Sequence, residues 1–231
     1  MIDTPAVRLL TRTEGGRDWP VLVWAPGPGW RAVSTGIVGG GLGPRAWWLD
    51  AQVDKEYFHP DPVAHAREIA RGLGLDPDAG VAMLTAADVS RWTQADDEGV
   101  TVAATVGLGL PVRAAVPPEV AAREGAEPAG TINVLVLVPA PLSDAALVNA
   151  VVTVTEAKAQ ALAEAGLPAT GTSSDAVCVA CPQPRGAEPE PYGGPRSLWG
   201  ARIARAVHRA VAEGTADWYS VQPGSGGTLP G

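Results

Sequence analysis

The sequence predicts a mixed α/β fold, in which a largely antiparallel or mixed sheet is covered by two long helices and one shorter helix. Three observations predict this class. The first third consists of short apolar runs divided by Gly-Gly and Pro-Gly turns, which is typical of strands. Residues 131–138 are almost purely branched and aliphatic, as in a central strand buried on both faces. Two long segments, 143–165 and 196–213, have helix signals at their ends.

The first third is predicted to form an antiparallel meander followed by the shorter helix. The strand-like runs are residues 7–11, 20–25, 30–35 and 46–53. The helix should begin at Pro62, because Asp61 can cap it and proline suits its first turn. It should end near Gly72, where a Gly-Leu-Gly sequence stops it.

The middle of the chain alternates between strands and a long helix. The short strands are expected at residues 81–86, 100–108 and 111–116, before a charged, alanine-rich surface excursion over 117–130. Ser143 caps the long helix, which should end near Ala165. Its β-branched residues 151–155 have low helix propensity, so a strand is the alternative for that piece.

The last quarter contains a loop, a helix and a tail. Residues 183–195 are rich in Pro, Glu and Gly and should form a loop or lid. The last helix is expected over 196–213, with a disordered tail over 214–231. We therefore expect one domain over residues 1–213, a size that can bury a proper core.

Composition excludes several classes of partner. A net charge of −8 with only 17 basic residues argues against a nucleic-acid partner, which would need clustered Lys and Arg. The apolar runs are far shorter than the roughly 20 residues that span a bilayer, so no membrane partner is expected. The start of the chain lacks a secretory signal, which predicts a cytoplasmic location. The oligomeric state is left open.

Cys178 and Cys181 form a C-x-x-C pattern that is typical of redox or zinc sites on helices. Here the pattern lies in a strand-like run, where residues three apart point to opposite faces. We interpret them as two small buried thiols.

The densest group of reactive side chains lies at residues 170–175, just before an apolar strand. It combines Thr170, Thr172, Ser173 and Ser174 with Asp175. Amide hydrolysis needs a nucleophile, a proton acceptor and donors for the developing oxyanion, and this turn supplies most of them. The alternative is a strand-entry turn whose side chains bond only to local backbone.

Two chemical schemes are open for this turn. In one, the hydroxyl of Thr172 or Ser174 attacks the carbonyl and forms an ester. In the other, which we favour slightly, Asp175 positions and deprotonates a water molecule. No G-x-S-x-G motif is present to indicate a serine hydrolase.

Histidines give weaker signals. His59 lies in a polar cluster before the first helix and is either a general acid or part of a solvated loop. His65 and His208 fall in helical patterns and are expected to be packing or surface residues. No metal-ligand motif such as H-E-x-x-H appears, so no metal site is predicted.

Glycine and tryptophan supply further candidates for ligand contact. Gly39 and Gly40 lack the following residues of a phosphate-binding loop, so they either let the backbone approach a large flat ligand or turn the chain. Trp47 and Trp48 should place one indole on each face of a strand, mainly for core packing.

An ordered set of separated motifs resembles the adenosylcobinamide amidohydrolase family of corrinoid salvage. The motifs are STGIVGGG (34–41), LTAAD (84–88), ATVG (104–107), GTIN (130–133), PLSDAAL (141–147), TEAK (155–158), TGTSSD (170–175) and YGGP (192–195). Ser174 departs from the threonine usual in that family but keeps the hydroxyl.

The resemblance implies hydrolysis of the amide that joins aminopropanol to the corrin ring of adenosylcobinamide, giving adenosylcobyric acid. The corrinoid is then the substrate, and no cofactor is expected. The catalytic candidates are Asp175, Ser174, Thr172 and His59, and the resemblance also allows His59 to be an axial ligand to the corrinoid cobalt. The substrate-binding candidates are Ser34, Thr35, Gly39, Gly40, Thr85, Thr105, Asn133, Glu156, Tyr192 and Gly193. The competing hypotheses are a non-catalytic corrinoid or tetrapyrrole binder, and an amidohydrolase that acts on another amide.

Overall fold

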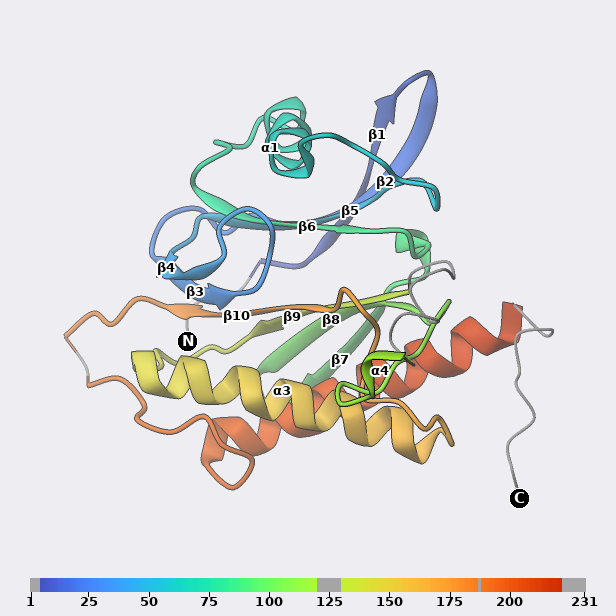
Figure 1. Ribbon diagram of the computed structural model, residues 1–231. Helices are drawn as coiled ribbons and strands as arrows, with labels where there is room; N and C mark the ends of the chain where they lie inside the picture. Colours follow the sequence, from blue (N-terminus) through green and yellow to red (C-terminus); the bar gives the residue numbers. More distant parts are fainter. Residues whose placement is uncertain (1–4, 120–129, 187, 222–231) are drawn as a thin grey trace.

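The structure, a computed structural model, describes residues 5–119, 130–186 and 188–221 and has four layers, shown in Figure 1. The upper sheet has the order β1-β2-β5-β6, with helix α1 (Pro62–Gly72) on its outer face. The lower sheet has the order β4-β3-β10-β9-β8-β7, with α3 (Asp144–Glu164) and α4 (Leu198–Val221) on its outer face. The predicted mixed α/β class, with two long helices and one shorter one, is confirmed.

The upper sheet combines three antiparallel strands with one parallel pair, and the predicted meander is wrong at residues 30–35, which pair with β10 in the lower sheet. Its strands are β1 (Arg8–Glu14), β2 (Arg17–Trp24), β5 (Trp47–Gln52) and β6 (Gly80–Thr85). Gly15 and Gly16 both have positive φ and close the β1–β2 hairpin, as the two-residue turns of tight hairpins require. Helix α1 connects β5 to the parallel β6, and Asp61 caps it as predicted.

The lower sheet draws strands from the whole chain. They are β3 (Trp30–Ser34), β4 (Gly41–Pro44), β7 (Thr93–Asp97), β8 (Val100–Gly107), β9 (Thr131–Leu137) and β10 (Ala176–Pro182). A 3-10 turn, η1 (Val89–Arg91), precedes β7. The parallel strands β9 and β10 are joined by α3, which Ser143 caps. All seven residues of β9 are buried, which confirms the prediction of a central strand.

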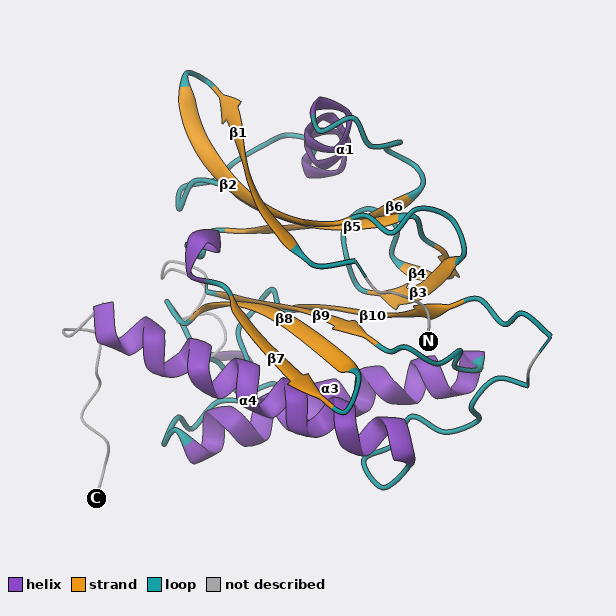
Figure 2. Cartoon of the chain, turned by 180° about the vertical axis from the view of Figure 1, so that it is seen from behind, coloured by secondary structure: helices purple, strands orange, loops and turns teal. Residues whose placement is uncertain are grey.

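The core follows the alternation of side chains along the strands. Even-numbered residues of β9 face the two long helices, whereas Leu135 and Leu137 pack between the sheets. Trp48 also lies between the sheets, while Trp47 lies under α1, so the two indoles are on opposite faces as predicted. Each sheet therefore buries both faces, one on helices and one on the other sheet (Figure 2).

Several expected elements differ from the structure. The predicted strand over 111–116 is wrong: only Val112 forms a bridge, to Gly171. The neighbours of β8 are already β7 and β9, so this segment has no free strand to pair with at that end. The strand alternative for 151–155 is also wrong, because these residues lie inside α3. Strands β4 and β7 were not predicted, because their Gly-rich and polar sequences lack an apolar alternation.

The end of the last helix was predicted too early. Helix α4 continues to Val221, so residues 214–221 belong to the helix and not to a tail. Gly214 is buried against β8, where an added Cβ would lie 2.5 Å from Cγ2 of Val106. This glycine therefore provides a close helix–sheet contact and does not end the helix. The rest of the predicted tail and most of the 117–130 excursion lie outside the described residues.

Candidate active site

The turn 170–175 lies at the end of the lower sheet where β10 begins. Helix α3 carries the chain back from the far end of the sheet, so its second half passes beside this turn. Residues 112–114 run along the other side, since the amide of Val112 donates to Gly171 and the amide of Ala114 to Thr170 Oγ1. The predicted reactive turn is thus enclosed by segments far apart in sequence.

Asp175 is the most heavily hydrogen-bonded group in the turn. Its Oδ1 accepts from the amide of Ile132 (2.9 Å) and from the hydroxyl of Thr172. Its Oδ2 accepts from the amide of Thr172 (3.1 Å) and from Nζ of Lys158. Four donors therefore converge on one carboxylate whose side chain is only 11% exposed.

Lys158, which we did not identify from the sequence, is the cation at this site. It is on α3, and its side chain is 9% exposed, which is rare for lysine. A signal for it was present, because only two of the 17 basic residues in the chain are lysines, and Lys158 ends the TEAK motif. The remaining fifteen basic residues are arginines, which stay charged and cannot exchange a proton.

The other hydroxyls of the turn have different partners. Ser174 lies 2.7 Å from the hydroxyl of Thr131 and donates to the carbonyl of Gly130 (3.1 Å). It therefore connects β10 to the start of β9 and does not contact Asp175 through any hydrogen bond found in the described residues. Of the two predicted nucleophiles, only Thr172 is bonded to the carboxylate.

Ser34 and Thr35 connect the same end of the sheet to the glycine-rich loop. The hydroxyl of Thr35 accepts from the amide of Val177 (3.0 Å), next to the start of β10. Ser34 is buried and accepts from the amide of Gly36 (2.9 Å). The loop then turns away over β6, because Val38 bridges to Ala82.

Gly39 and Gly40 lie in this tightly packed loop. Gly39 has φ +67°, and a Cβ there would collide with the carbonyl of Gly80. A Cβ on Gly40 would lie 2.9 Å from the carbonyl of Gly36. The close packing of this loop therefore explains glycine at both positions, and their contact with substrate stays a prediction.

A second polar cluster joins the two sheets directly beside the turn. Asp50 on β5 is fully buried and accepts from Thr105 Oγ1 (2.7 Å) and from Asn133 Nδ2 (2.8 Å) across the interface. Burial raises the pKa of Asp50 to about 6, although both hydrogen bonds act to lower it. Thr105 and Asn133 were predicted site residues, whereas Asp50 was not.

Two features extend this second cluster towards β6. Thr85 is buried and accepts from the amide of Ala87 (3.0 Å). Ala87 in turn packs on Gly107, where an added Cβ would lie 2.9 Å from the Cβ of Ala87. The Oδ1 of Asn133 is buried and has no hydrogen-bond partner within the described part of the chain.

Three predicted substrate-binding residues lie away from this end. Tyr192 is 71% exposed, and Gly193 packs on the first half of α3, where its carbonyl accepts from Thr153 Oγ1 (2.8 Å). In Figure 1 their loop lies at the opposite end of α3 from the start of β10. Glu156 is exposed on the outer surface of α3. The structure therefore does not bring these residues to Asp175.

His59 lies in a separate cluster near α1. Its ring stacks on His65 at 5.0 Å, and Tyr57 donates or accepts at Nδ1 of His65 (2.8 Å). The amide of Asp61 donates to Nδ1 of His59 (3.1 Å), which leaves the proton of the neutral ring on Nε2. No hydrogen bond in the described residues connects His59 to the turn at 170–175, so both of its predicted roles stay predictions.

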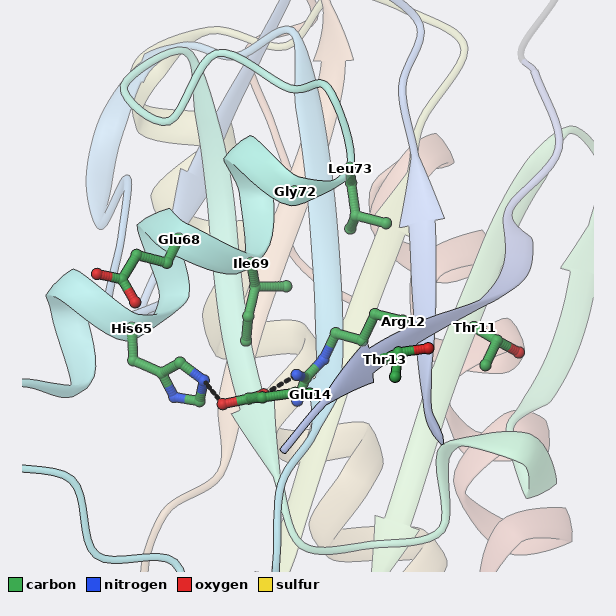
Figure 3. A pocket seen from close by; sticks show the side chains of 9 residues that line it. All are labelled: Thr11, Arg12, Thr13, Glu14, His65, Glu68, Ile69, Gly72 and Leu73. Atoms are coloured by element: carbon green, nitrogen blue, oxygen red, sulfur yellow. Dashed lines mark hydrogen bonds and ion pairs between the residues drawn. The ribbon is translucent and has the colours of Figure 1, made fainter. Parts of the chain in front are cut away.

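Beside that cluster, a pocket of about 390 Å³ lies between β1 and α1, as Figure 3 shows. His65 Nε2 is 2.8 Å from Glu14, which also pairs with Arg12. Burial by itself would raise the pKa of Glu14, but the hydrogen bond and charge of Arg12, together with His65, lower it. His65 is buried beside these partners, so it is a packing residue, as expected. His208, the other helical histidine, pairs with Glu164 at the surface.

Cys178 and Cys181 are free and buried on opposite faces of β10, which confirms our interpretation. Burial raises the pKa of the Cys178 thiol to about 12, so it is an inert thiol at neutral pH. In the described residues no group of three His, Cys, Asp or Glu side chains could hold a metal ion. None of the helices described is both long and apolar enough to cross a bilayer.

The fold and the site define the class of protein. Thr172, Asp175 and Lys158 bring a hydroxyl, a carboxylate and an ammonium group into one chain of contacts, and enzymes that carry out acyl transfer use groups of these kinds. An α/β fold with these groups at one site indicates an enzyme of the hydrolase class.

Comparisons with known proteins specify the family. The family model described as adenosylcobinamide amidohydrolase matches residues 6–223. The adenosylcobinamide amidohydrolase of Methanosarcina mazei is 33% identical over 190 residues, covering 79% of this chain and 88% of that protein. That of Halobacterium salinarum is 37% identical over 188 residues, covering 80% and 79%. The chain belongs to the adenosylcobinamide amidohydrolase family, as its motifs indicated.

Proposed function

We propose that this protein hydrolyses the amide that joins aminopropanol to the corrin ring of adenosylcobinamide. The products are adenosylcobyric acid and aminopropanol, and the reaction serves corrinoid salvage. Family membership over most of the chain supports the reaction. In this proposal the corrinoid is the substrate, no further cofactor takes part, and the enzyme works in the cytoplasm without a nucleic-acid partner.

One observation carries the assignment of the site. Four of the eight motifs meet around the start of β10, where Lys158, Asp175 and the turn at 170–175 are joined to the starts of β9 and β10 and to Thr35. The PLSDAAL and YGGP motifs lie instead at the opposite end of α3. We infer that the scissile amide binds at the first end, over the hydroxyl of Thr172.

The test compares two equally buried aspartates. Asp175→Asn keeps the shape of the side chain but removes its charge, and it should lower kcat/KM by about 10³-fold, within the usual range for a lost acid–base group. Asp97→Asn is the matched control, because Asp97 is also ion-paired and only 10% exposed. It lies at the end of β7 that is remote from Asp175. Its kcat/KM should stay within about threefold of the wild type, as for sites remote from the chemistry.

The measurement is chromatographic release of adenosylcobyric acid and aminopropanol, with and without a chelator. Product from the wild type that is unaffected by the chelator supports a reaction without a metal. Binding of the corrinoid without any product from the wild type would favour the non-catalytic binder. Hydrolysis that Asp175→Asn leaves intact would remove Asp175 from the mechanism.

A further inference from the structure

We propose that Thr172 is the nucleophile, that Asp175 accepts its proton, and that Lys158 positions Asp175. This inference rests on the proposed function and decides between the two chemical schemes. It predicts a covalent ester between Thr172 and the corrin side-chain carbonyl, where the alternative scheme has a water molecule attack directly.

The carboxylate of Asp175 has no place left for a water molecule. A carboxylate offers about four lone-pair positions, two on each oxygen. The amides of Ile132 and Thr172, the ammonium of Lys158 and the hydroxyl of Thr172 occupy four. A water could bond to Asp175 only after one of these donors was displaced.

Only one of those four donors is a nucleophile. The two backbone amides cannot attack a carbonyl, and the nitrogen of the Lys158 ammonium has no lone pair. The hydroxyl of Thr172 points its proton at Oδ1 of Asp175, which leaves its oxygen lone pairs free. Thr172 is half-buried, so a substrate can reach it, whereas Lys158 lies beneath.

The other hydroxyl that we considered is held differently. Ser174 bonds to Thr131 and to the carbonyl of Gly130, and neither group can take a proton from it to make it a nucleophile. The hydrogen bonds thus distinguish Thr172 from Ser174, which the sequence alone presented as equal candidates for the nucleophile.

The role of Lys158 follows from burial and from Gly171. A side chain on Gly171 would collide with both Nζ of Lys158 and Oδ2 of Asp175, so the glycine lets the backbone close over the pair. The ammonium therefore fixes Oδ2, which directs Oδ1 at Thr172. Because Lys158 acts through Asp175, it is a positioning residue.

The steps balance in atoms and charge. The Thr172 oxygen bonds to the amide carbon while its proton passes to Asp175, and the C–N bond breaks as that proton goes to the leaving amine. Water then attacks the ester, its proton passes through Asp175 to the Thr172 oxygen, and adenosylcobyric acid leaves. No oxidant, reductant or metal is consumed.

The first test removes the hydroxyl. Thr172→Val is nearly isosteric and should lower kcat by at least about 10³-fold, whereas Thr172→Ser should retain a measurable rate. Thr101→Val is the matched control, because the hydroxyl of Thr101 also donates a hydrogen bond to an aspartate, Asp96. Thr101 lies near the end of β8 that is remote from Asp175. Melting temperatures of all variants show whether each remains folded.

The second test looks for the ester. Wild type and Thr172→Ser are quenched with acid during turnover, and the adduct is located on residue 172 by peptide mass spectrometry. An adduct there supports the proposal. The proposal is overturned if neither enzyme carries an adduct, or if Thr172→Val keeps more than a tenth of the wild-type rate.

The third test concerns Lys158. Lys158→Met should lower kcat about 100-fold while KM stays within about threefold, because the cation orients Asp175 and does not bind substrate. A rise in KM with kcat unchanged would overturn the positioning role. If the wild type itself released no aminopropanol, the proposed function would fail, and that outcome is distinct from each result above.

Discussion

The packing around Gly39 fixes its backbone conformation. It lies in the left-handed region at φ +67°, with the carbonyl of Gly80 directly where a side chain would begin. Two costs therefore add at this position: the strain of a left-handed non-glycine residue and a collision with backbone that has no rotamer to adopt.

Gly39→Ala should destabilise the protein by at least about 3 kcal/mol, measured by denaturant unfolding. Gly41 is the matched control, because its φ is +80° and no atom lies within 4 Å of a Cβ there. Gly41→Ala therefore has the strain alone and should cost about 1 kcal/mol. Equal losses in the two variants would contradict the role of the collision.

Single residues with local signals were predictable, whereas residues that depend on a distant partner were not. Asp61 and Ser143 cap their helices as their positions in the sequence indicated. Glu156 was expected near the site, but Lys158 occupies it. Residues two apart on a helix point in directions about 200° apart, so only one of them can face the sheet. The sequence of the TEAK motif does not say which.

The contact between α4 and β8 shows how an element is positioned by one small residue. Gly214 lies in the interior of α4, where glycine costs about 1 kcal/mol relative to alanine. The close approach to Val106 offsets that cost. This is why a glycine that resembles a helix end in the sequence is part of a continuous helix.

Gly214→Ala should destabilise the protein by about 1–3 kcal/mol despite the better helix propensity, because the new methyl group overpacks against Val106. Adding Val106→Ala should restore part of the loss in a double-mutant cycle followed by thermal unfolding. Losses that simply add would show that the two residues do not interact.

At the scale of the whole molecule, Asp50 connects the two sheets. It belongs to β5 of the upper sheet, and its partners Thr105 and Asn133 belong to the lower one. The pKa of this carboxyl is raised by burial from 3.8 to about 6. The folded state therefore holds the proton more tightly than the unfolded chain does.

The raised pKa of Asp50 makes the folded state less stable as the pH rises. The stabilising contribution is complete below pH 3.8 and is lost as the pH rises to about 6, because the unfolded chain then releases the proton first. The loss is on the order of 3 kcal/mol. Asp50→Asn cannot titrate at this position. Between pH 4 and pH 7 its free energy of unfolding should therefore rise by about that amount relative to the free energy of unfolding of the wild type.

The measurement is urea unfolding of both proteins across this pH range. The other carboxyl groups are common to the two proteins and cancel in the difference. A difference that does not change with pH would contradict the raised pKa.

The four-layer arrangement was beyond the sequence analysis for a physical reason. Local patterns predicted the class, most strands and three helices, because alternation and capping act over a few residues. The partner of each strand depends on contacts between distant segments. Strand β3 leaves the meander and pairs with β10 in the other sheet, and nothing within residues 30–34 indicates it.

That pairing has a consequence for the newly made chain. The hydroxyl of Thr35 and the amide of Val177, which bond beside the turn, are 142 residues apart. At roughly 5–20 residues per second, a ribosome makes the second partner on the order of ten seconds after the first. During that interval β3 lacks its main neighbour, and an open strand edge invites association with other chains. The pairing of distant segments thus leaves one edge of β3 exposed for most of the time that the chain is being made.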